Sequence, residues 1–228
     1  MAQITSGLRR ALSNSLFYES FQRLLGATSL YKTYVNEYIK PNHNSNILDI
    51  GCGTSAILKY LPNGVNYTGY DLSSTYISTA EARFGQRGKW FCADAANMDL
   101  NEASSYDIVM ANGLFHHLND EECTSLACTA SKALKPEGVF FSIDACYTDK
   151  QSPIARLIIN KDRGQNIRYA YEYQKNLFDY FSSIQVYIRS DLLRIPYAHA
   201  IIIASQPKDS DHACKHFAGG DNGDLTSF

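Results

Sequence analysis

The sequence has no long hydrophobic run and no excess of charge of either sign. Its 228 residues carry 21 Lys and Arg against 23 Asp and Glu, so no general field would attract nucleic acid or an anionic membrane. The longest apolar pieces, such as residues 200–204, fall far short of the roughly 18 residues that a membrane-spanning helix needs. We therefore expect no integral membrane association and no nucleic-acid partner.

Paired cysteines are also lacking. The six cysteines are scattered without a C-x-x-C motif, and most have apolar neighbours, where a reduced thiol behaves as a small hydrophobic side chain. This usage predicts a cytoplasmic protein. Residues 1–18 carry Arg9, Arg10 and no acidic residue, which loosely resembles an organelle transit peptide, although the stretch fits a helix of the mature protein better.

The composition is that of a globular protein, with 45% apolar and 19% charged residues. A chain of this length buries roughly 70% of its unfolded surface and needs no disulfide or metal to fold. We expect one domain over residues 1–205. Residues 206–228 contain Gly219, Gly220 and four aspartates with little apolar content, so they are predicted to form a disordered tail.

Strands and helices alternate from residue 46 onward. Short apolar strands are predicted at 46–50, 66–70, 89–92, 106–111 and 139–145. Helices are predicted at 55–61, 74–84 and 120–134, the last preceded by Asn119 with Glu122 three residues later, which approximates a capping box. The alternation predicts an α/β fold with a doubly wound parallel sheet.

Two helical segments flank this core. Apolar residues at spacings of three and four predict N-terminal helices over 4–25 and 30–39. An insertion after the fifth strand, over 148–183, carries predicted helices at 153–160 and 169–181. Two closing strands follow at 184–189 and 199–204.

A glycine loop follows the first strand. Gly51 and Gly53 stand where the backbone must turn tightly and where a side chain would collide with a ligand at the helix start. Asp71 ends the second strand, 20 residues beyond Gly51, and a carboxylate there can accept both hydroxyl hydrogens of a ribose. The order of these features predicts a nucleoside-bearing cofactor.

Further polar residues follow other strands. Asp49 lies within the end of the first strand, Asp94-Ala95 ends the third, and Asn112-Gly113-Leu114-Phe115-His116-His117-Leu118 follows the fourth. Together with Ile47-Leu48-Asp49-Ile50-Gly51-Cys52-Gly53, these motifs make residues 45–145 resemble the class I S-adenosylmethionine-dependent methyltransferases. Outside that range the likeness is looser.

The resemblance implies a cofactor, S-adenosylmethionine, and a Rossmann-like sheet of order 3-2-1-4-5-7-6 whose last strand is antiparallel. Asp49, Gly51 and Gly53 would line the methionine end. Asp71 would hold the ribose hydroxyls, and Leu72 would pack on the adenine.

The resemblance also assigns the later motifs. Asp94 would contact the adenine amino group with Ala95 beside it, and Asn112 would lie under the methionine portion. Family members commonly close the site with an N-terminal helix and the insertion after strand 5, which here are residues 1–40 and 148–183.

A dehydrogenase binding NAD(P) is the rival interpretation, because Gly51-x-Gly53-x-x-Ala56 also satisfies the dinucleotide fingerprint. Tyr171 and Lys175 have the spacing of a short-chain dehydrogenase pair, but about 0.8 such pairs arise by chance in this composition (16 × 11/228). A methyltransferase acting on protein or RNA, and a binding module without an acceptor site, are further alternatives.

The acceptor side carries two histidines. His116 and His117 follow the fourth strand, and a pKa near 6.5 suits proton removal from an acceptor. Either is a candidate general base, although a histidine that only holds the loop backbone explains the pattern better.

Three residues of the insertion region are predicted to contact the acceptor: Tyr147, Arg168 and Tyr171. Tyr171 belongs to a dense run of tyrosines that can form a pocket wall, and Arg168 to a locally basic stretch. No metal site is predicted, because His212, Cys214 and His216 fall in the predicted tail. The sequence thus predicts methyl transfer to the oxygen or nitrogen of a small molecule.

Overall fold

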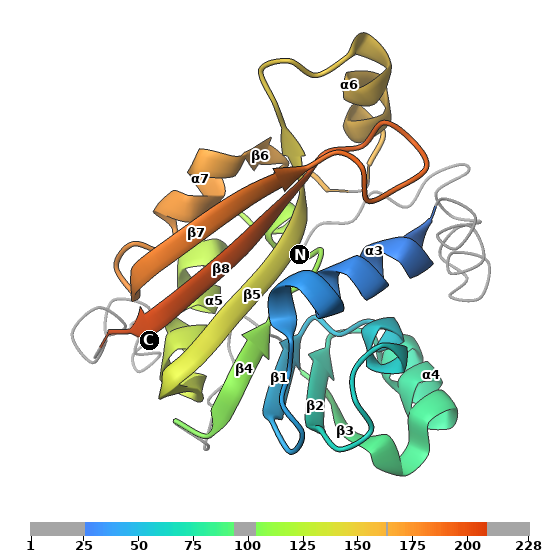
Figure 1. Ribbon diagram of the computed structural model, residues 1–228, viewed down its shortest axis with the longest axis vertical. Coiled ribbons are helices and arrows are strands. Elements are labelled where there is room, and N and C mark those ends of the chain that lie inside the picture. The colour runs from blue at the N-terminus through green and yellow to red at the C-terminus, as the bar shows by residue number, and fades with distance from the viewer. Residues whose placement is uncertain (1–25, 94–103, 163, 209–228) are drawn as a thin grey trace, which may run out of the picture.

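The computed structural model describes residues 26–93, 104–162 and 164–208. The predicted helix at 4–25 and residues 209–228 of the predicted tail lie outside these ranges. Figure 1 shows a single twisted sheet with helices packed against it. Along the sheet the strands follow the order β3-β2-β1-β4-β5-β8-β7, and the short β6 (Arg168–Tyr169) pairs with the end of β5 away from this path.

Parallel strands make up most of the sheet. They are β1 (Asn46–Ile50), β2 (Asn66–Asp71), β3 (Gly88–Cys92), β4 (Tyr106–Met110) and β5 (Leu134–Tyr147). The closing strands are β7 (Phe181–Arg189) and β8 (His199–Pro207), and β8 runs antiparallel to both β5 and β7. Because β6 lies off the main path, the order corresponds to 3-2-1-4-5-7-6, and the predicted topology is confirmed.

Each face of the sheet has its own apolar core. On one face, α3 (Ala27–Thr33), the π-helical segment η1 (Tyr34–Ile39) and α4 (Ser74–Phe84) cover a cluster that includes Ile47 and Met110. On the other, α5 (Asp120–Ala133) and α7 (Ala170–Lys175) cover a cluster that includes Leu48 and Phe140. Alternate residues of a strand point to opposite faces, so one apolar strand serves both cores.

Local sequence signals account for several element ends. The capping box predicted at Asn119 is confirmed: its side chain accepts from the Glu122 amide at 2.8 Å, and the Glu122 carboxylate accepts from the Asn119 amide at 2.9 Å. Pro153 opens α6 (Pro153–Asn160), whose cap is the Ser152 side chain. Proline suits this first position because its missing N–H would have no helical partner there.

Several predicted boundaries are wrong. The helix expected at 30–39 begins at Ala27, and the strand expected at 184–189 begins at Phe181. The helix expected at 55–61 is a short 3₁₀ segment, η2 (Ala56–Lys59), after Ser55 at φ +54°. The helix expected at 169–181 ends at Lys175, because Phe181 already pairs with Pro207 in the β7–β8 ladder. That ladder makes residues 206–207 part of β8 instead of the tail. β5 is longer than predicted, with residues 135–138 bulging out between two pairs to β4.

The described residues also bear on two expectations about compartment. None of the helices described in the structure is long and apolar enough to cross a membrane. Cys52, Cys92, Cys123 and Cys146 are free thiols, whereas Cys128 is disulfide-bonded. The expectation of reduced cysteines therefore holds for those four.

Candidate cofactor and acceptor site

The glycine loop leaves β1 through a tight turn. Gly51 and Gly53 adopt φ of +73° and +54°, which strain an L-residue. The amides of Gly51 and Cys52 both donate to the Tyr70 carbonyl, at 2.8 and 2.9 Å. A Cβ on Gly51 would lie 3.1 Å from the Leu114 side chain. The glycine at this position thus allows the loop of β1 to pack against the loop that follows β4.

Asp71, at the end of β2, is tied to the glycine loop. Its Oδ2 accepts from the Gly53 amide at 2.9 Å and its Oδ1 from the Ser73 amide at 2.8 Å. Burial raises the pKa of Asp71, and these two hydrogen bonds oppose the rise. Each carboxylate oxygen keeps a second lone pair for a ligand. Beside it, Leu72 exposes 46% of its surface.

Asp49 is buried at the end of β1 with one oxygen unused. Its Oδ2 accepts from the Tyr67 hydroxyl at 2.6 Å, and its Oδ1 has no hydrogen-bond partner among the described residues. Burial raises the pKa of Asp49 to about 7; the Tyr67 bond opposes this, and the charge of Asp71 adds to it. An unpartnered buried carboxylate oxygen is costly unless a ligand supplies a donor.

Asn112 follows β4 and has an unused hydrogen-bond donor, whereas Asp49 has an unused acceptor. Its Oδ1 accepts from the Tyr34 hydroxyl at 2.9 Å, while its buried Nδ2 has no partner within the described ranges. Tyr34 is fully buried and belongs to η1. Tyr34 was not among the predicted site residues, because helical spacing predicts only a helix over 30–39 and cannot show that the Tyr34 hydroxyl reaches the loop after β4.

His116 lies in the loop after β4, in η5 (Phe115–His117), and is buried. Its Nδ1 is 2.8 Å from Asp144 Oδ1, and its Nε2 is 3.6 Å from Asp162 Oδ1. Burial alone favours the neutral ring, but the Asp144 hydrogen bond and the charges of both carboxylates raise the pKa of His116. Asp162 was not among the predicted site residues.

His117 is half-buried, with its ring centre 4.2 Å from that of His116. The structure thus places the two predicted base candidates side by side. Their surroundings differ, because carboxylates flank both ring nitrogens of His116. His117 is the more accessible of the two.

The three predicted acceptor residues have other contacts in the structure. Arg168 donates to the carbonyls of Phe115, Leu118 and Asn166 and pairs with Asp120 at 2.8 Å. Tyr171 is 57% exposed, with Lys175 over its ring. The Tyr147 hydroxyl donates to Asn160 at 2.9 Å. Asp94 and Ala95 lie outside the described residues.

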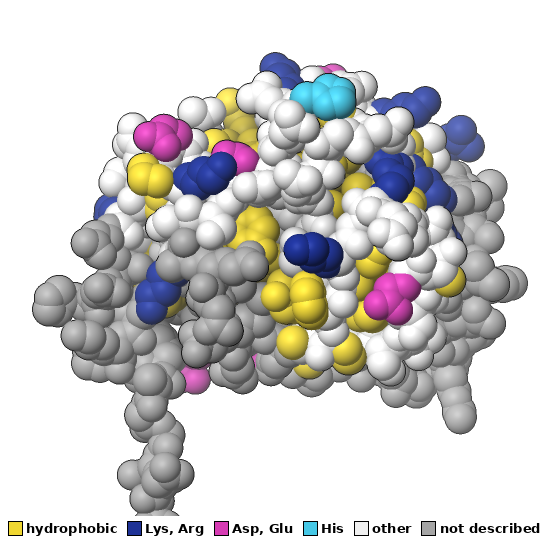
Figure 2. All heavy atoms as spheres, turned by 90° about the horizontal axis from the view of Figure 1, so that it is seen from below, with side chains coloured by type: hydrophobic (Ala, Val, Ile, Leu, Met, Phe, Trp, Pro, Cys, Tyr) yellow, Lys and Arg dark blue, Asp and Glu magenta, His cyan; other side chains and the backbone are white. Residues whose placement is uncertain are grey.

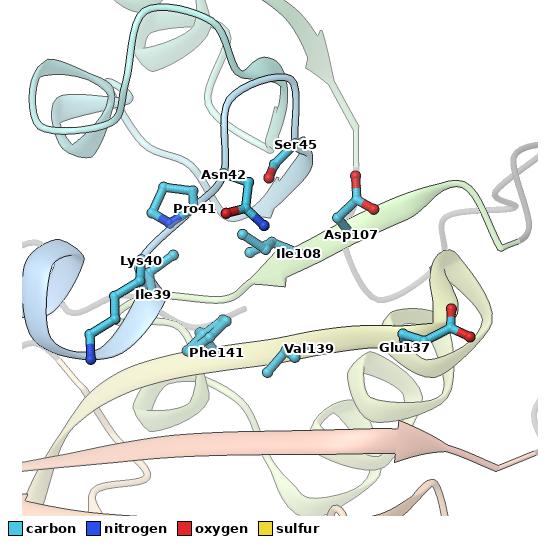
Figure 3. Close-up of a pocket in the computed structure, with 10 residues that line it drawn as sticks. All are labelled: Ile39, Lys40, Pro41, Asn42, Ser45, Asp107, Ile108, Glu137, Val139 and Phe141. Carbon is cyan, nitrogen blue, oxygen red and sulfur yellow. The ribbon is translucent and has the colours of Figure 1, made fainter.

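A cavity lies at the amino ends of the strands, at the opposite end of the sheet from the glycine loop. Figure 3 shows its lining at the amino ends of β1, β4 and β5, where Asp107 and Glu137 stand at one end and Lys40 at the other. Its volume is about 250 Å³. Ligands of open α/β sheets bind at the carboxyl ends of the strands, so this cavity is separate from the glycine loop. No group of three or more potential metal ligands occurs among the residues described.

The fold and the site define a Rossmann-like domain. Its first strand is followed by a glycine loop of the kind found in nucleotide-binding α/β domains. Residues 47–138 match a family model described as a methyltransferase domain. Over 107 residues, 45% of this chain and 38% of the relative, the sequence is 31% identical to malonyl-[acyl-carrier protein] O-methyltransferase of Bacillus anthracis. It is 28% identical to phosphoethanolamine N-methyltransferase of Plasmodium falciparum over 118 residues, 50% of this chain and 44% of that protein.

A solved structure extends the likeness beyond the matched core. Phosphoethanolamine N-methyltransferase 2 of Haemonchus contortus, in complex with phosphomonomethylethanolamine and S-adenosylhomocysteine, superposes with a TM-score of 0.70. The identity is 14%, over 88% of this chain and 59% of that one. The chain spans less than half the length of the two curated relatives.

These findings confirm the resemblance inferred from the sequence. The methyltransferase-domain match over residues 47–138 and the methyltransferase relatives support a class I S-adenosylmethionine-dependent methyltransferase. The comparisons give no support to the dehydrogenase alternative.

Proposed function

We propose that the protein transfers a methyl group from S-adenosylmethionine to an oxygen or nitrogen of a small-molecule acceptor. The family match over residues 47–138 supports the class of reaction. The observation that carries the proposal is the pair of unpartnered buried atoms at the ends of β1 and β4, Asp49 Oδ1 and Asn112 Nδ2.

This pair fits the methionine end of the cofactor. An amino acid carries an ammonium group, which donates hydrogen bonds, and a carboxylate, which accepts them. Asp49 Oδ1 is an acceptor and Asn112 Nδ2 is a donor, so both buried atoms would gain the partner that each lacks. Asp71 and Leu72, at the end of β2, would take the ribose and the adenine, with Asp94 and Ala95 completing the adenine end.

The protein's own task in this reaction is positional. The bound cofactor supplies a methyl group already activated on a sulfonium. The side chains then align the acceptor and exclude water. A base is needed only for a hydroxyl or a protonated amine, and His117 is our candidate for it because its ring is the more accessible of the histidine pair.

Residues 1–40 and 148–183 are proposed to cover this site within a single domain over 1–205. The described part of the first segment places Tyr34 against Asn112. In the second, the amide of Asn166 donates to the His116 carbonyl at 2.9 Å. Both segments therefore contact the loop after β4, where the methyl group would be presented.

The acceptor is proposed to be a small molecule met in the cytoplasm. The relatives' names give one O-methyltransferase and one N-methyltransferase, so they leave the methylated atom open. On the face in Figure 2, Lys and Arg are dispersed among acidic and hydrophobic side chains. Together with a net charge of −2, this distribution favours a small acceptor over RNA, which attracts clustered basic residues.

Calorimetric titration with S-adenosylhomocysteine, beside NAD and NADP, tests the proposal. We expect micromolar binding of the first and none of the other two. Asn112→Ala should weaken binding roughly tenfold or more, the scale of a lost hydrogen bond to a charged group. The control is Asn42→Ala, an exposed asparagine at the opposite edge of the sheet. Preference for a nicotinamide cofactor would overturn the proposal.

A further inference from the structure

Two carboxylates from different parts of the fold face the His116 ring. Asp144 lies on β5, in the sheet, and its side chain is fully buried. Asp162 lies just after α6, in the insertion, and its side chain is 27% exposed. The ring is 11% exposed and separates them. His116 therefore connects the sheet to the insertion.

Both carboxylates are fixed by further hydrogen bonds. Asp144 accepts from the Ser142 hydroxyl and from the His116 amide. Asp162 Oδ1 accepts from the Gly164 amide at 2.9 Å, and its Oδ2 accepts from the Tyr197 hydroxyl at 2.7 Å. A fully buried carboxylate such as Asp144 is costly without a compensating charge. A protonated His116 would supply that charge to Asp144 and would also attract the partly exposed Asp162.

The insertion also rests directly on the ring. A Cβ on Gly164 would lie 2.2 Å from His116 Cδ2 and 2.8 Å from the His116 carbonyl oxygen, so only glycine allows this approach. The amide of Asn166 then donates to the same carbonyl at 2.9 Å. Backbone packing and charge thus act at one point, between the insertion and the loop that follows β4.

We infer that Asp144 and Asp162 hold His116 as an imidazolium and that this charge docks the insertion over the acceptor end of the site. Asp162 is then a positioning residue that acts through His116. His116 is unsuited to be the general base, because carboxylates face both of its nitrogens. That the insertion covers the acceptor end of the site rests on the proposed function. The charge state of His116 and the docking of the insertion do not depend on that function.

The other titratable groups near the His116 ring are His199, His117 and Arg168, and the charge of His117 also lowers the pKa of Asp162. His199, on β8, is nearly fully buried, and burial lowers its pKa to about 4, so it is neutral at neutral pH. His117 packs against the ring from the same loop. Arg168 binds the carbonyls on either side of the histidine pair, at Phe115 and Leu118. In the described residues, the charges facing the His116 nitrogens are the two carboxylates.

The pH dependence of docking follows from the ionisation of both His116 and Asp162. The pKa of His116 is raised, so its contribution to docking is complete at low pH and is lost as pH rises through that pKa. Burial tends to raise the pKa of Asp162, but the charge of His116 and the bonds from Gly164 and Tyr197 bring it below its ordinary value. Its contribution is lost as pH falls through that lowered pKa. Docking is therefore strongest between the two.

Nitrogen NMR of the histidine rings tests the charge state without any ligand. In the wild-type chain we expect His116 to remain protonated at pH 7 and to titrate above 6.5. The signal is assigned by its absence in His116→Gln. Asp162→Asn should lower the midpoint by about one pH unit, as expected when an opposite charge 3.6 Å from the ring nitrogen is removed. A His116 ring that is neutral at pH 7 in the wild type overturns the inference.

The matched control is Asp149→Asn, an exposed acidic residue at the start of the same insertion. It should leave the His116 midpoint unchanged. An equal shift in both variants would mean that general charge, and not the Asp162 contact, sets the ring's titration, which would also overturn the inference.

Hydrogen exchange tests the docking itself. After correction for intrinsic rates, peptides covering residues 149–167 should exchange faster above the His116 midpoint than at pH 7. Asp162→Asn should abolish this difference, whereas a purely structural contact would lose protection equally at both pH values. Because neither measurement uses cofactor or turnover, failure here is distinct from failure of the proposed methyl transfer.

Discussion

At the residue scale, the candidate cofactor site is defined by buried polar atoms that have no hydrogen-bond partner among the described residues. The Asp49 carboxylate combines burial, one hydrogen bond from Tyr67 and one free oxygen. Such an arrangement costs free energy in the unliganded protein and lowers the cost of binding a cation. Sites of this kind concentrate perturbed pKa values for the same reason.

Asp49 should make cofactor binding depend on pH. Its folded-state pKa is about 7, against 3.8 ordinarily, so the folded protein holds an extra proton between about pH 4 and 7 and loses stability as pH rises through this window. An ammonium ligand requires the ionised form. Affinity for S-adenosylhomocysteine, measured by calorimetry, should therefore rise from pH 6 to pH 8. Asp49→Asn should remove this rise, and a rise that persists in the variant would assign it elsewhere.

Asp71→Ala should weaken S-adenosylhomocysteine binding by about 1–3 kcal/mol, since hydrogen bonds to a charged group are lost. It also leaves the amides of Gly53 and Ser73 without their acceptor, so the melting temperature should fall as well. Asp71→Asn, which retains one acceptor oxygen, should show smaller effects in both measurements. Glu81→Ala, an exposed acidic residue on α4, is the control. Unchanged affinity in Asp71→Ala would mean that the ribose lies elsewhere.

The sequence could nominate Asp49, Gly51, Gly53 and Asp71 as candidate site residues because they depend on chain order: each lies at or just after the end of a strand, within a short, recognisable motif. Tyr34 and Asp162 carry no such motif. Tyr34 reaches Asn112 across 78 positions of sequence, and such a contact arises only when the helix packs on the sheet. Long-range contacts of this kind could not be read from local patterns.

At the element scale, the helices whose bounds were predicted best carry capping residues at their own ends. α4 and α6 begin and end as predicted, and α5 begins at its capping box. The helix predicted at 169–181 failed because residues 176–180 form a turn and Phe181 already begins the edge strand β7. The pairing of Phe181 with Pro207 of β8 ends the helical spacing of aromatic residues, as tertiary context often outweighs propensity.

Asn119→Ala tests the element-scale argument. The substitution removes the acceptor for the Glu122 amide and one half of the capping box, so the free energy of unfolding should fall by about 1 kcal/mol, within the usual range for a lost cap. Urea denaturation provides the measurement. Asn119→Asp should retain most of the stability, because aspartate caps equally well. Equal loss in both variants would show that the cap is not the cause.

At the scale of the whole molecule, the insertion is joined to the domain through the loop between β4 and α5. Arg168 bonds to the carbonyls of Phe115 and Leu118 in that loop and to Asp120 in the first turn of α5. The guanidinium has five donors in a planar fork, so one side chain can serve several acceptors at once. This geometry makes Arg168 a structural cross-link, in contrast to the acceptor contact expected from its basic surroundings.

Arg168→Met separates these two roles. Methionine preserves much of the apolar length but removes the guanidinium hydrogen bonds to the Phe115, Leu118 and Asn166 carbonyls, so we expect the free energy of unfolding to fall by about 2–3 kcal/mol, measured by urea denaturation. Arg156→Met is the control, because Arg156 is an exposed arginine of the same insertion that lies over the Tyr147 ring, and it should cost far less. If Arg168→Met retained full stability and yet lost turnover, the side chain would be an acceptor ligand after all. Loss of stability with unchanged KM for the acceptor would establish the cross-link, because a group that binds the acceptor cannot be removed without weakening that binding.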